Sequence, residues 1–212
     1  MKPIRIVALF VAGLIASTTV AQAQEVRITP ELPFIELELN EEFIVIERNQ
    51  DNTALITSAF AKTSRPCPPF CVHPMSAGEG VVTVGEVELI AFLEDKVQLN
   101  EGFLVDARTA NFFKAGTIPG SINLPFNLFT PSDVNPFLAP LLMRLGGQMQ
   151  NDGTWSFADS PELMLFCNGP WCDQSPRAIR NLMTMGYPAD RLFYYRGGMQ
   201  NWLMLGLTVQ VP

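Results

Sequence analysis

The chain has 212 residues, of which 48% are hydrophobic and 17% charged, and its formal net charge is −7. An apolar fraction this high excludes an intrinsically disordered chain, and the acidic balance argues against a nucleic-acid-binding protein, which presents a basic face. Four cysteines are too few for a disulfide scaffold, and the single histidine, His73, excludes a paired-histidine metalloprotease site.

The N-terminal residues have the pattern of a secretory signal peptide. Lys2 and Arg5 precede an apolar run over 6–15, and small residues follow as far as Ala23. The alternative is an uncleaved membrane anchor, but the apolar run is much shorter than the roughly 20 residues that span a bilayer. We therefore expect residues 1–23 to be removed from an exported protein, periplasmic in a Gram-negative cell, with no membrane span after cleavage.

Residues 24–79 predict a small β-rich extension. The segment 34–39 alternates apolar and acidic side chains, and 43–46 resumes the apolar pattern after a polar break, which predicts a hairpin. A short apolar run at 54–57 predicts an additional edge strand. The four prolines of segment 65–74 exclude regular structure there, and we place a domain boundary shortly after it.

From residue 80 onward, apolar strands alternate with helices. Strands are predicted at 81–83, 102–106, 163–166 and 192–195, and helices at 86–93, at 176–185 and from 197 onward. This alternation predicts an α/β domain over 80–212, with a parallel sheet flanked by helices on both faces. Asp106 and Cys167 stand at the carboxyl ends of two strands, where reactive groups lie in such sheets.

Cys167 begins a loop that leads into a helix, for which Ser175 is the predicted N-cap and Pro176 the first helical residue. A loop above a helix N-terminus directs backbone N–H groups and the positive end of the helix dipole inward. We therefore expect a lowered pKa for the Cys167 thiol, which would react as a thiolate. The alternative is a cysteine packed as a small apolar residue.

Four short motifs, in this order, resemble signature segments of the rhodanese (sulfurtransferase) family. They are LVDAR at 104–108, GTIPGSINLP at 116–125 with Thr117 where histidine is usual, LFC at 165–167 and YRGGMQNW at 195–202. The resemblance covers 81–212. It implies a rhodanese-like sheet in an exported, single-domain member of the family that has a CxxxxC active-site loop.

The resemblance implies covalent sulfur transfer without a cofactor. Cys167 would take the outer sulfur of a donor anion such as thiosulfate as a persulfide, and a thiol or cyanide acceptor would remove it. Asp106 and Arg108 would tie the strand end to nearby loops. The implied substrate-binding residues are those of the loop and the helix start: Asn168, Gly169, Trp171, Asp173, Gln174, Ser175 and Arg177.

The active-site segment departs from the family pattern in its charge. No basic residue occurs at 168–174, Asp173 is acidic, and the loop is longer than is usual. The absence of an arginine at the end of the loop argues against the activity of the related dual-specificity phosphatases. Arg177 and Arg180 offer positive charge for a dianionic donor, or are solvated charges on the helix surface.

Cys172 lies five residues after Cys167, so it can attack a persulfide on Cys167 or close a disulfide with it. We expect it to act as the resolving thiol. The alternative is a set of static disulfides, within each short cysteine pair or between the pairs.

Cys67 and Cys71 form a second close pair, for which a structural disulfide, disulfide exchange and metal binding remain open. With His73 and Met75 they offer soft ligands that favour Cu(I). Besides the sulfurtransferase, two functions therefore remain. One is a thiol–disulfide redox protein that uses both cysteine pairs with a periplasmic partner, and the other is a non-catalytic module that binds copper or a sulfur anion.

Overall fold

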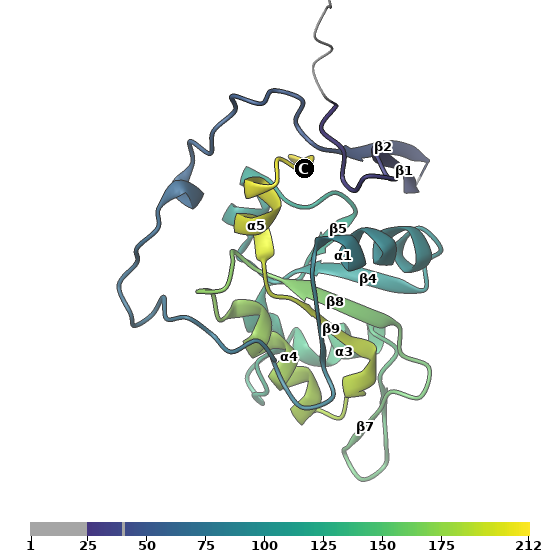
Figure 1. Cartoon of the computed structure of the whole chain (residues 1–212). Coiled ribbons are helices and arrows are strands. Elements are labelled where there is room, and N and C mark those ends of the chain that lie inside the picture. Colours follow the sequence, from purple (N-terminus) through teal and green to yellow (C-terminus); the bar gives the residue numbers. More distant parts are fainter. Residues whose placement is uncertain (1–24, 40) are drawn as a thin grey trace, which may run out of the picture.

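The structure is a computed structural model that describes residues 25–39 and 41–212. Its centre is a five-stranded sheet in the order β3-β9-β8-β4-β5, in which all neighbouring strands are parallel (Figure 1). The predicted parallel sheet is therefore confirmed. Its strands are β3 (Val82–Val84), β4 (Gly102–Asp106), β5 (Ser121–Asn123), β8 (Glu162–Phe166) and β9 (Leu192–Tyr195).

The register of the central strands sets the position of the site. Asp106 at the end of β4 is paired with Phe166 at the end of β8, and Phe166 is also paired with Tyr195 at the end of β9. Residues 163–166 are all buried, because helices cover both faces of a parallel sheet. Cys167 therefore follows the middle strand at the carboxyl edge of the sheet.

Helices cover both faces of the sheet, as predicted. One face packs against η3 (Phe126–Phe129), α3 (Leu138–Arg144) and α4 (Gln174–Thr184). The other packs against α1 (Glu86–Phe92), its π-helical continuation η2 (Leu93–Val97) and α5 (Gly198–Met204). The remaining elements are α2 (Ala110–Ala115), a short hairpin of β6 (Gln148–Met149) and β7 (Trp155–Ser156), and the 3-10 turn η4 (Ala189–Arg191).

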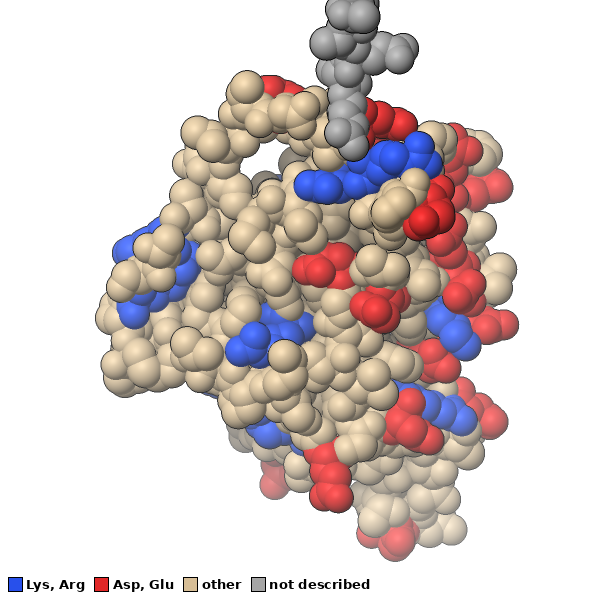
Figure 2. Space-filling view, viewed as in Figure 1, with Lys and Arg blue, Asp and Glu red and all other residues tan. Residues whose placement is uncertain are grey.

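The N-terminal hairpin is formed by β1 (Phe34–Leu39) and β2 (Glu42–Glu47), which confirms the prediction from the alternating pattern. Ile35, Leu37 and Ile46 are buried in the same apolar core as α1 and α5. The acidic residues of the alternation face solvent, and Figure 2 shows acidic side chains gathered over this side of the molecule. The hairpin thus extends the domain core.

The predicted edge strand at 54–57 is wrong. This segment pairs with no strand, and the side chain of Leu55 is 84% exposed. The chain instead crosses one side of the domain (Figure 1), with the 3-10 turn η1 (Ala59–Ala61) as the last regular element before β3. We call residues 58–75 the strap. The domain boundary near residue 80 stays a prediction.

The predicted signal peptide, residues 1–23, lies outside the described residues, so export stays a prediction. Across 25–39 and 41–212, none of the helices combines the length and the hydropathy that a membrane crossing requires.

Candidate active site

Cys167 is held at the end of β8 by the start of α5. The backbone N–H of Met199 donates to the Cys167 carbonyl at 3.0 Å, and that of Gln200 donates to the Asn168 carbonyl at 3.0 Å. Gly198 lies with φ +56° against the same backbone, and a Cβ at this position would come within 2.7 Å of the Gly169 nitrogen. The glycines of the YRGGMQNW motif therefore bring α5 against the active-site loop.

The sulfur of Cys167 is surrounded by hydrogen-bond donors. The Ser175 hydroxyl donates to Sγ at 3.1 Å. Burial by itself raises the pKa of Cys167. Hydrogen bonds from the Cys172 thiol, the Ser175 hydroxyl and the amides of Ser175 and Gly169 outweigh burial and lower the pKa below its ordinary value. The environment agrees with the expectation of a thiolate. The Cys172 carbonyl lies 3.3 Å from Sγ of Cys167. Because a carbonyl oxygen only accepts hydrogen bonds, it can pair with Cys167 when that thiol is protonated and not when it is a thiolate.

The start of α4 differs from the prediction. The helix begins at Gln174 with Asp173 as N-cap, and the Asp173 side chain makes no capping hydrogen bond. Cys172 N–H closes a turn onto the Gly169 carbonyl at 2.9 Å, and this turn starts the helix earlier than expected. The Ser175 hydroxyl is consequently available to the sulfur. Pro176 is the third helical residue, where its missing N–H is still tolerated.

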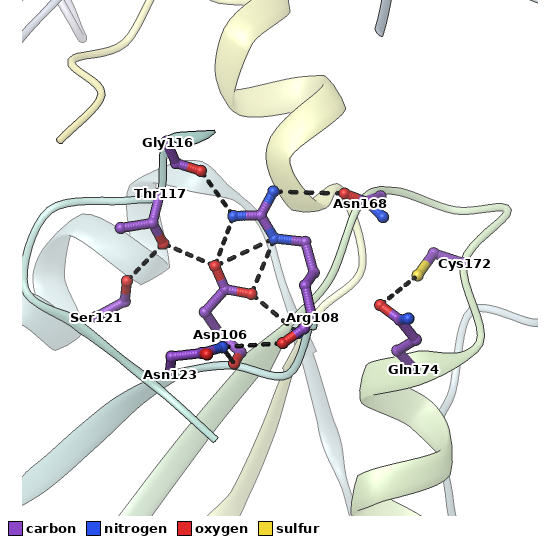
Figure 3. Close-up of polar contacts among 9 residues, drawn as sticks. All are labelled: Asp106, Arg108, Gly116, Thr117, Ser121, Asn123, Asn168, Cys172 and Gln174. Atoms are coloured by element: carbon purple, nitrogen blue, oxygen red, sulfur yellow. Dashed lines mark hydrogen bonds and ion pairs between the residues drawn. The ribbon is translucent and has the colours of Figure 1, made fainter. Parts of the chain in front are cut away.

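Cys172 remains a free thiol inside the same loop. It is 6% exposed, and Oε1 of Gln174, 3.7 Å from its Sγ, is a second acceptor for its one thiol proton beside Cys167 (Figure 3). The hydrogen bond with Cys167, burial, and the negative charge on Cys167 all raise the pKa of Cys172. The two cysteines therefore differ in protonation, with the proton kept on Cys172.

Asp106 and Arg108 form a buried ion pair beside the loop, with Nη2 and Oδ2 2.6 Å apart (Figure 3). Arg108 also donates to the Gly116 carbonyl at 2.7 Å and to Oδ1 of Asn168 at 3.4 Å. The Thr117 hydroxyl donates to Asp106 at 2.8 Å. The pair thus ties the end of β4 to two loops, as the family resemblance implies, and Thr117 fills the position where histidine is usual.

The strap covers the active-site loop through Trp171. The Arg65 guanidinium lies 3.7 Å from the centre of the Trp171 ring, and the Phe70 ring meets it edge-on with centroids 5.7 Å apart. The His73 N–H donates to the Pro170 carbonyl at 2.9 Å. These contacts flank Cys67 and Cys71 along the chain, so the extension brings that pair close to the loop.

Residues that follow β9 also make hydrogen bonds to the strap. Arg196 donates to the carbonyls of His73, at 2.8 Å, and Pro74, at 3.2 Å. Gln200 accepts a hydrogen bond from the Trp171 indole and donates to the Phe60 carbonyl at 3.2 Å. Cys167 beneath this cover is 2% exposed.

The remaining predicted site residues are engaged within the protein. Asp173 forms an ion pair with Arg177 one turn later in α4. Cys67 and Cys71 form a disulfide, which leaves no thiolate on this pair for Cu(I). Among the described residues, no group of three or more histidine, cysteine, aspartate or glutamate side chains is placed to hold a metal ion.

Arg65, Arg196 and Gln200 are neighbours of the loop that no sequence pattern indicated. Arg196 and Gln200 lie within the YRGGMQNW motif, which predicts the start of a helix but no contact for either side chain. Arg65 is the first residue of the proline-rich segment 65–74. Its position two residues before Cys67 was the only feature of the sequence that linked it to a candidate site.

A family model described as a rhodanese-like domain matches residues 87–205. The HTH-type transcriptional regulator Rv0324 of Mycobacterium tuberculosis (strain ATCC 25618 / H37Rv) is 30% identical over 112 residues, which are 53% of this chain and 39% of that protein. The chain thus spans well under half the length of this curated relative.

Two solved structures are similar to parts of the chain. The BH2092 protein of Bacillus halodurans is 19% identical with a TM-score of 0.44, over 61% of this chain and 76% of that one. The human single-domain sulfurtransferase TSTD1 is 24% identical with a TM-score of 0.39, over 57% of this chain and 95% of that one. Because the family model covers more than half of the 212 residues, the chain belongs to the rhodanese-like domain family.

Proposed function

We propose that this protein is a sulfurtransferase in which Cys167 carries the transferred sulfur as a persulfide. The observation that carries the proposal is the set of donors around its sulfur: the Ser175 hydroxyl at 3.1 Å and the amides of Gly169 and Ser175. Donors in fixed positions stabilise an anion without reorganisation. They suit both the attacking thiolate and the anionic outer sulfur of a persulfide.

The loading step uses thiosulfate or a related sulfane anion. The Cys167 thiolate attacks the outer sulfur of thiosulfate, a new S–S bond forms, and the bond between the two sulfurs of thiosulfate breaks. Sulfite leaves with the electron pair of that bond, so charge and atoms balance. A thiol or cyanide then accepts the sulfur.

Two arginines outside the loop support an anionic donor. Arg177 is neutralised by Asp173, whereas Arg65 and Arg196 form no ion pair with any carboxylate of the described chain. Both contact the loop or the strap directly. In Figure 2, the charged side chains over the strap side are basic, while acidic ones gather over the hairpin. Positive charge for the donor would therefore come from the strap and the end of β9.

The burial of Cys167 requires the strap to move during loading. A donor must touch Sγ of Cys167, a residue that is 2% exposed, and the strap packs on Trp171 and Pro170 of the same loop. The strap contains only one short helical turn and is held by aromatic and backbone contacts, so we expect it to open without unfolding the sheet.

We also propose that the protein is exported and works in the periplasm. The signal-like pattern of residues 1–23 motivates the proposal. The Cys67–Cys71 disulfide is consistent with an oxidising compartment.

Sulfite release tests the proposed function. Reduced protein is mixed with thiosulfate in the absence of added thiol, and sulfite is measured over a single turnover. We expect about one sulfite per protein from the wild type and none from Cys167→Ser. A wild type that releases no sulfite from thiosulfate, and is not loaded by any other sulfane donor, would exclude sulfur transfer.

A further inference from the structure

The two free thiols of the active-site loop lie next to one another. The turn from Gly169 to Cys172 folds the loop back, so that the Cys172 carbonyl is 3.3 Å from Sγ of Cys167. Both side chains are nearly fully buried, at 2% and 6% exposure. The turn thus packs Cys172 against Cys167, and the Cys172 thiol is one of the hydrogen-bond donors to the sulfur that receives the donor atom.

The charges in the loop assign different roles to the two sulfurs. The pKa of Cys167 is lowered despite its burial, because donors from Cys172, Ser175 and Gly169 surround it. The pKa of Cys172 is raised by the hydrogen bond to Cys167, by burial, and by the negative charge there. Cys172 therefore holds a proton directly beside an anionic sulfur.

The strap makes an internal acceptor more accessible than an external one. A thiol from solution must displace Trp171 and the strap residues packed on it before it reaches Cys167. Cys172 reaches the same sulfur without any such opening. A reaction partner held in place has a large advantage over one that must diffuse in and be oriented.

We infer that Cys172 resolves the Cys167 persulfide within the closed loop, so that the protein releases free sulfide and is left with a Cys167–Cys172 disulfide. This inference rests on the proposed function, because it begins from the loaded Cys167. It adds a second activity, the reduction of sulfane sulfur by a protein dithiol.

The resolving step conserves atoms, charge and electrons. The sulfur of Cys172 attacks Sγ of Cys167, the Sγ–Sγ bond forms, and the bond from Sγ to the carried sulfur breaks. The carried sulfur leaves with the bonding electron pair and takes the Cys172 proton, which gives HS⁻. The two cysteines are oxidised by two electrons in total, and the sulfane sulfur is reduced by two.

Turnover then needs a reductant of the dithiol or monothiol class. Two external thiols, or one dithiol, reduce the Cys167–Cys172 disulfide by exchange and are themselves oxidised to a disulfide. The external thiol therefore acts as an electron donor in this scheme, and the transferred sulfur leaves as sulfide before that thiol reacts.

The test follows sulfite and sulfide together in the full-length protein. Reduced protein is freed of reductant under anaerobic conditions, thiosulfate is added, and both products are quantified over one turnover. Intact mass and peptide mapping then report the state of the cysteines. We expect the wild type to release sulfide in an amount equal to its sulfite, and to lose two hydrogens in a bond between Cys167 and Cys172.

The matched variant is Cys172→Ser. Loss of the Cys172 thiol removes one donor to Sγ of Cys167, so the rate of sulfite release should change. We still expect this variant to release sulfite, to release no sulfide, and to retain the mass of one sulfur atom on Cys167. Its sulfite release also reports that the variant is folded.

Two results would overturn the inference, and they are distinguishable. If wild type releases sulfite but keeps the sulfur on Cys167 until a thiol is added, internal resolution is wrong and the sulfurtransferase proposal stands. If neither wild type nor Cys172→Ser releases sulfite or becomes loaded, the proposed function fails and the inference fails with it.

Discussion

The hydroxyl of Ser175 donates a hydrogen bond to the sulfur of Cys167 over 3.1 Å, from the second residue of α4 to the end of β8. Both side chains are buried, so water does not compete for this interaction. A hydrogen bond to a charged group contributes about 1.5–3 kcal/mol in proteins. Ser175 should therefore be a major stabiliser of the thiolate.

Replacing Ser175 by alanine should shift the reactivity of Cys167 to higher pH. Because the pKa of Cys167 is lowered in the folded protein, its thiolate fraction rises at a lower pH than that of an ordinary thiol. Loss of the hydroxyl removes one cause of the lowering, so the rise moves to higher pH. We expect sulfite release at neutral pH to fall about tenfold, in line with one charge-assisted hydrogen bond.

The pH profile of sulfite release provides the measurement. Ser132→Ala is a suitable control, because Ser132 is exposed and its hydroxyl contacts only the nearby Val134 N–H. Its profile should match that of the wild type. A Ser175→Ala profile that coincides with both would show that backbone donors alone set the charge on Cys167.

Removing the Trp171 side chain should open the site. Trp171 receives Arg65 and Phe70 of the strap and donates to Gln200, so its replacement by alanine removes all three interactions. Opening free energies in proteins range from near zero up to the global stability. We expect alkylation of Cys167 by a neutral reagent to accelerate about tenfold, which corresponds to about 1.4 kcal/mol of strap closure.

Trp155→Ala is the matched control for this experiment. Trp155 packs on Phe157 and the core below α4, away from the loop. Its loss should lower stability without changing the alkylation rate of the folded protein. Equal acceleration in both variants would mean that general loosening, and not the strap, controls access to the sulfur.

Asp106 and Asp173 should respond very differently to substitution by asparagine. Asp106 and its partner Arg108 are 0% and 1% exposed, whereas Asp173 and Arg177 are 32% and 49% exposed. Breaking a buried pair leaves an uncompensated charge and costs about 3–5 kcal/mol. An exposed pair contributes less than about 1 kcal/mol. We therefore expect Asp106→Asn to lose several times more unfolding free energy in urea than Asp173→Asn; similar losses would contradict the structural role of the Asp106–Arg108 pair.

Local patterns predicted four of the five strands of the sheet, because β4, β8 and β9 are largely apolar runs with clear ends. The fifth strand, β5, has the sequence Ser-Ile-Asn and carries no such pattern. The run 192–195 has the bounds of β9 itself. The run 54–57 has the same local character, but a strand also needs a partner, and this segment pairs with no strand of the described chain. Whether a segment pairs into a sheet depends on tertiary contacts, so it cannot be predicted from a short apolar run alone.

The chemistry of the site was predictable only in part. Cys167 could be located because it follows a buried strand and precedes a helix. The role of Ser175 could not, because it depends on the exact residue at which α4 begins. The contact of Arg65 with Trp171 joins a segment without periodicity to a loop far along the chain, and no local pattern records such a contact.

Gly198 offers the sharpest test of how the loop is held. Its φ of +56° costs a residue with a side chain about 1–2 kcal/mol. A Cβ there would also meet the backbone at Cys167 and Gly169. Backbone cannot move aside as a flexible side chain can, so Gly198→Ala should displace the active-site loop. We expect it to lose both stability and sulfite release.

Gly153→Ala separates the conformational cost of a positive φ from the clash of a Cβ with neighbouring backbone. Gly153 has a φ of +83°, yet a Cβ there would meet nothing within 4 Å. It should therefore show only the conformational cost, about 1–2 kcal/mol in urea unfolding, and retain full sulfite release. If Gly198→Ala costs no more than Gly153→Ala and still releases sulfite, the close approach of α5 does not position Cys167. The donors around its sulfur must then be held by α4 and by the loop's own turn from Gly169 to Cys172.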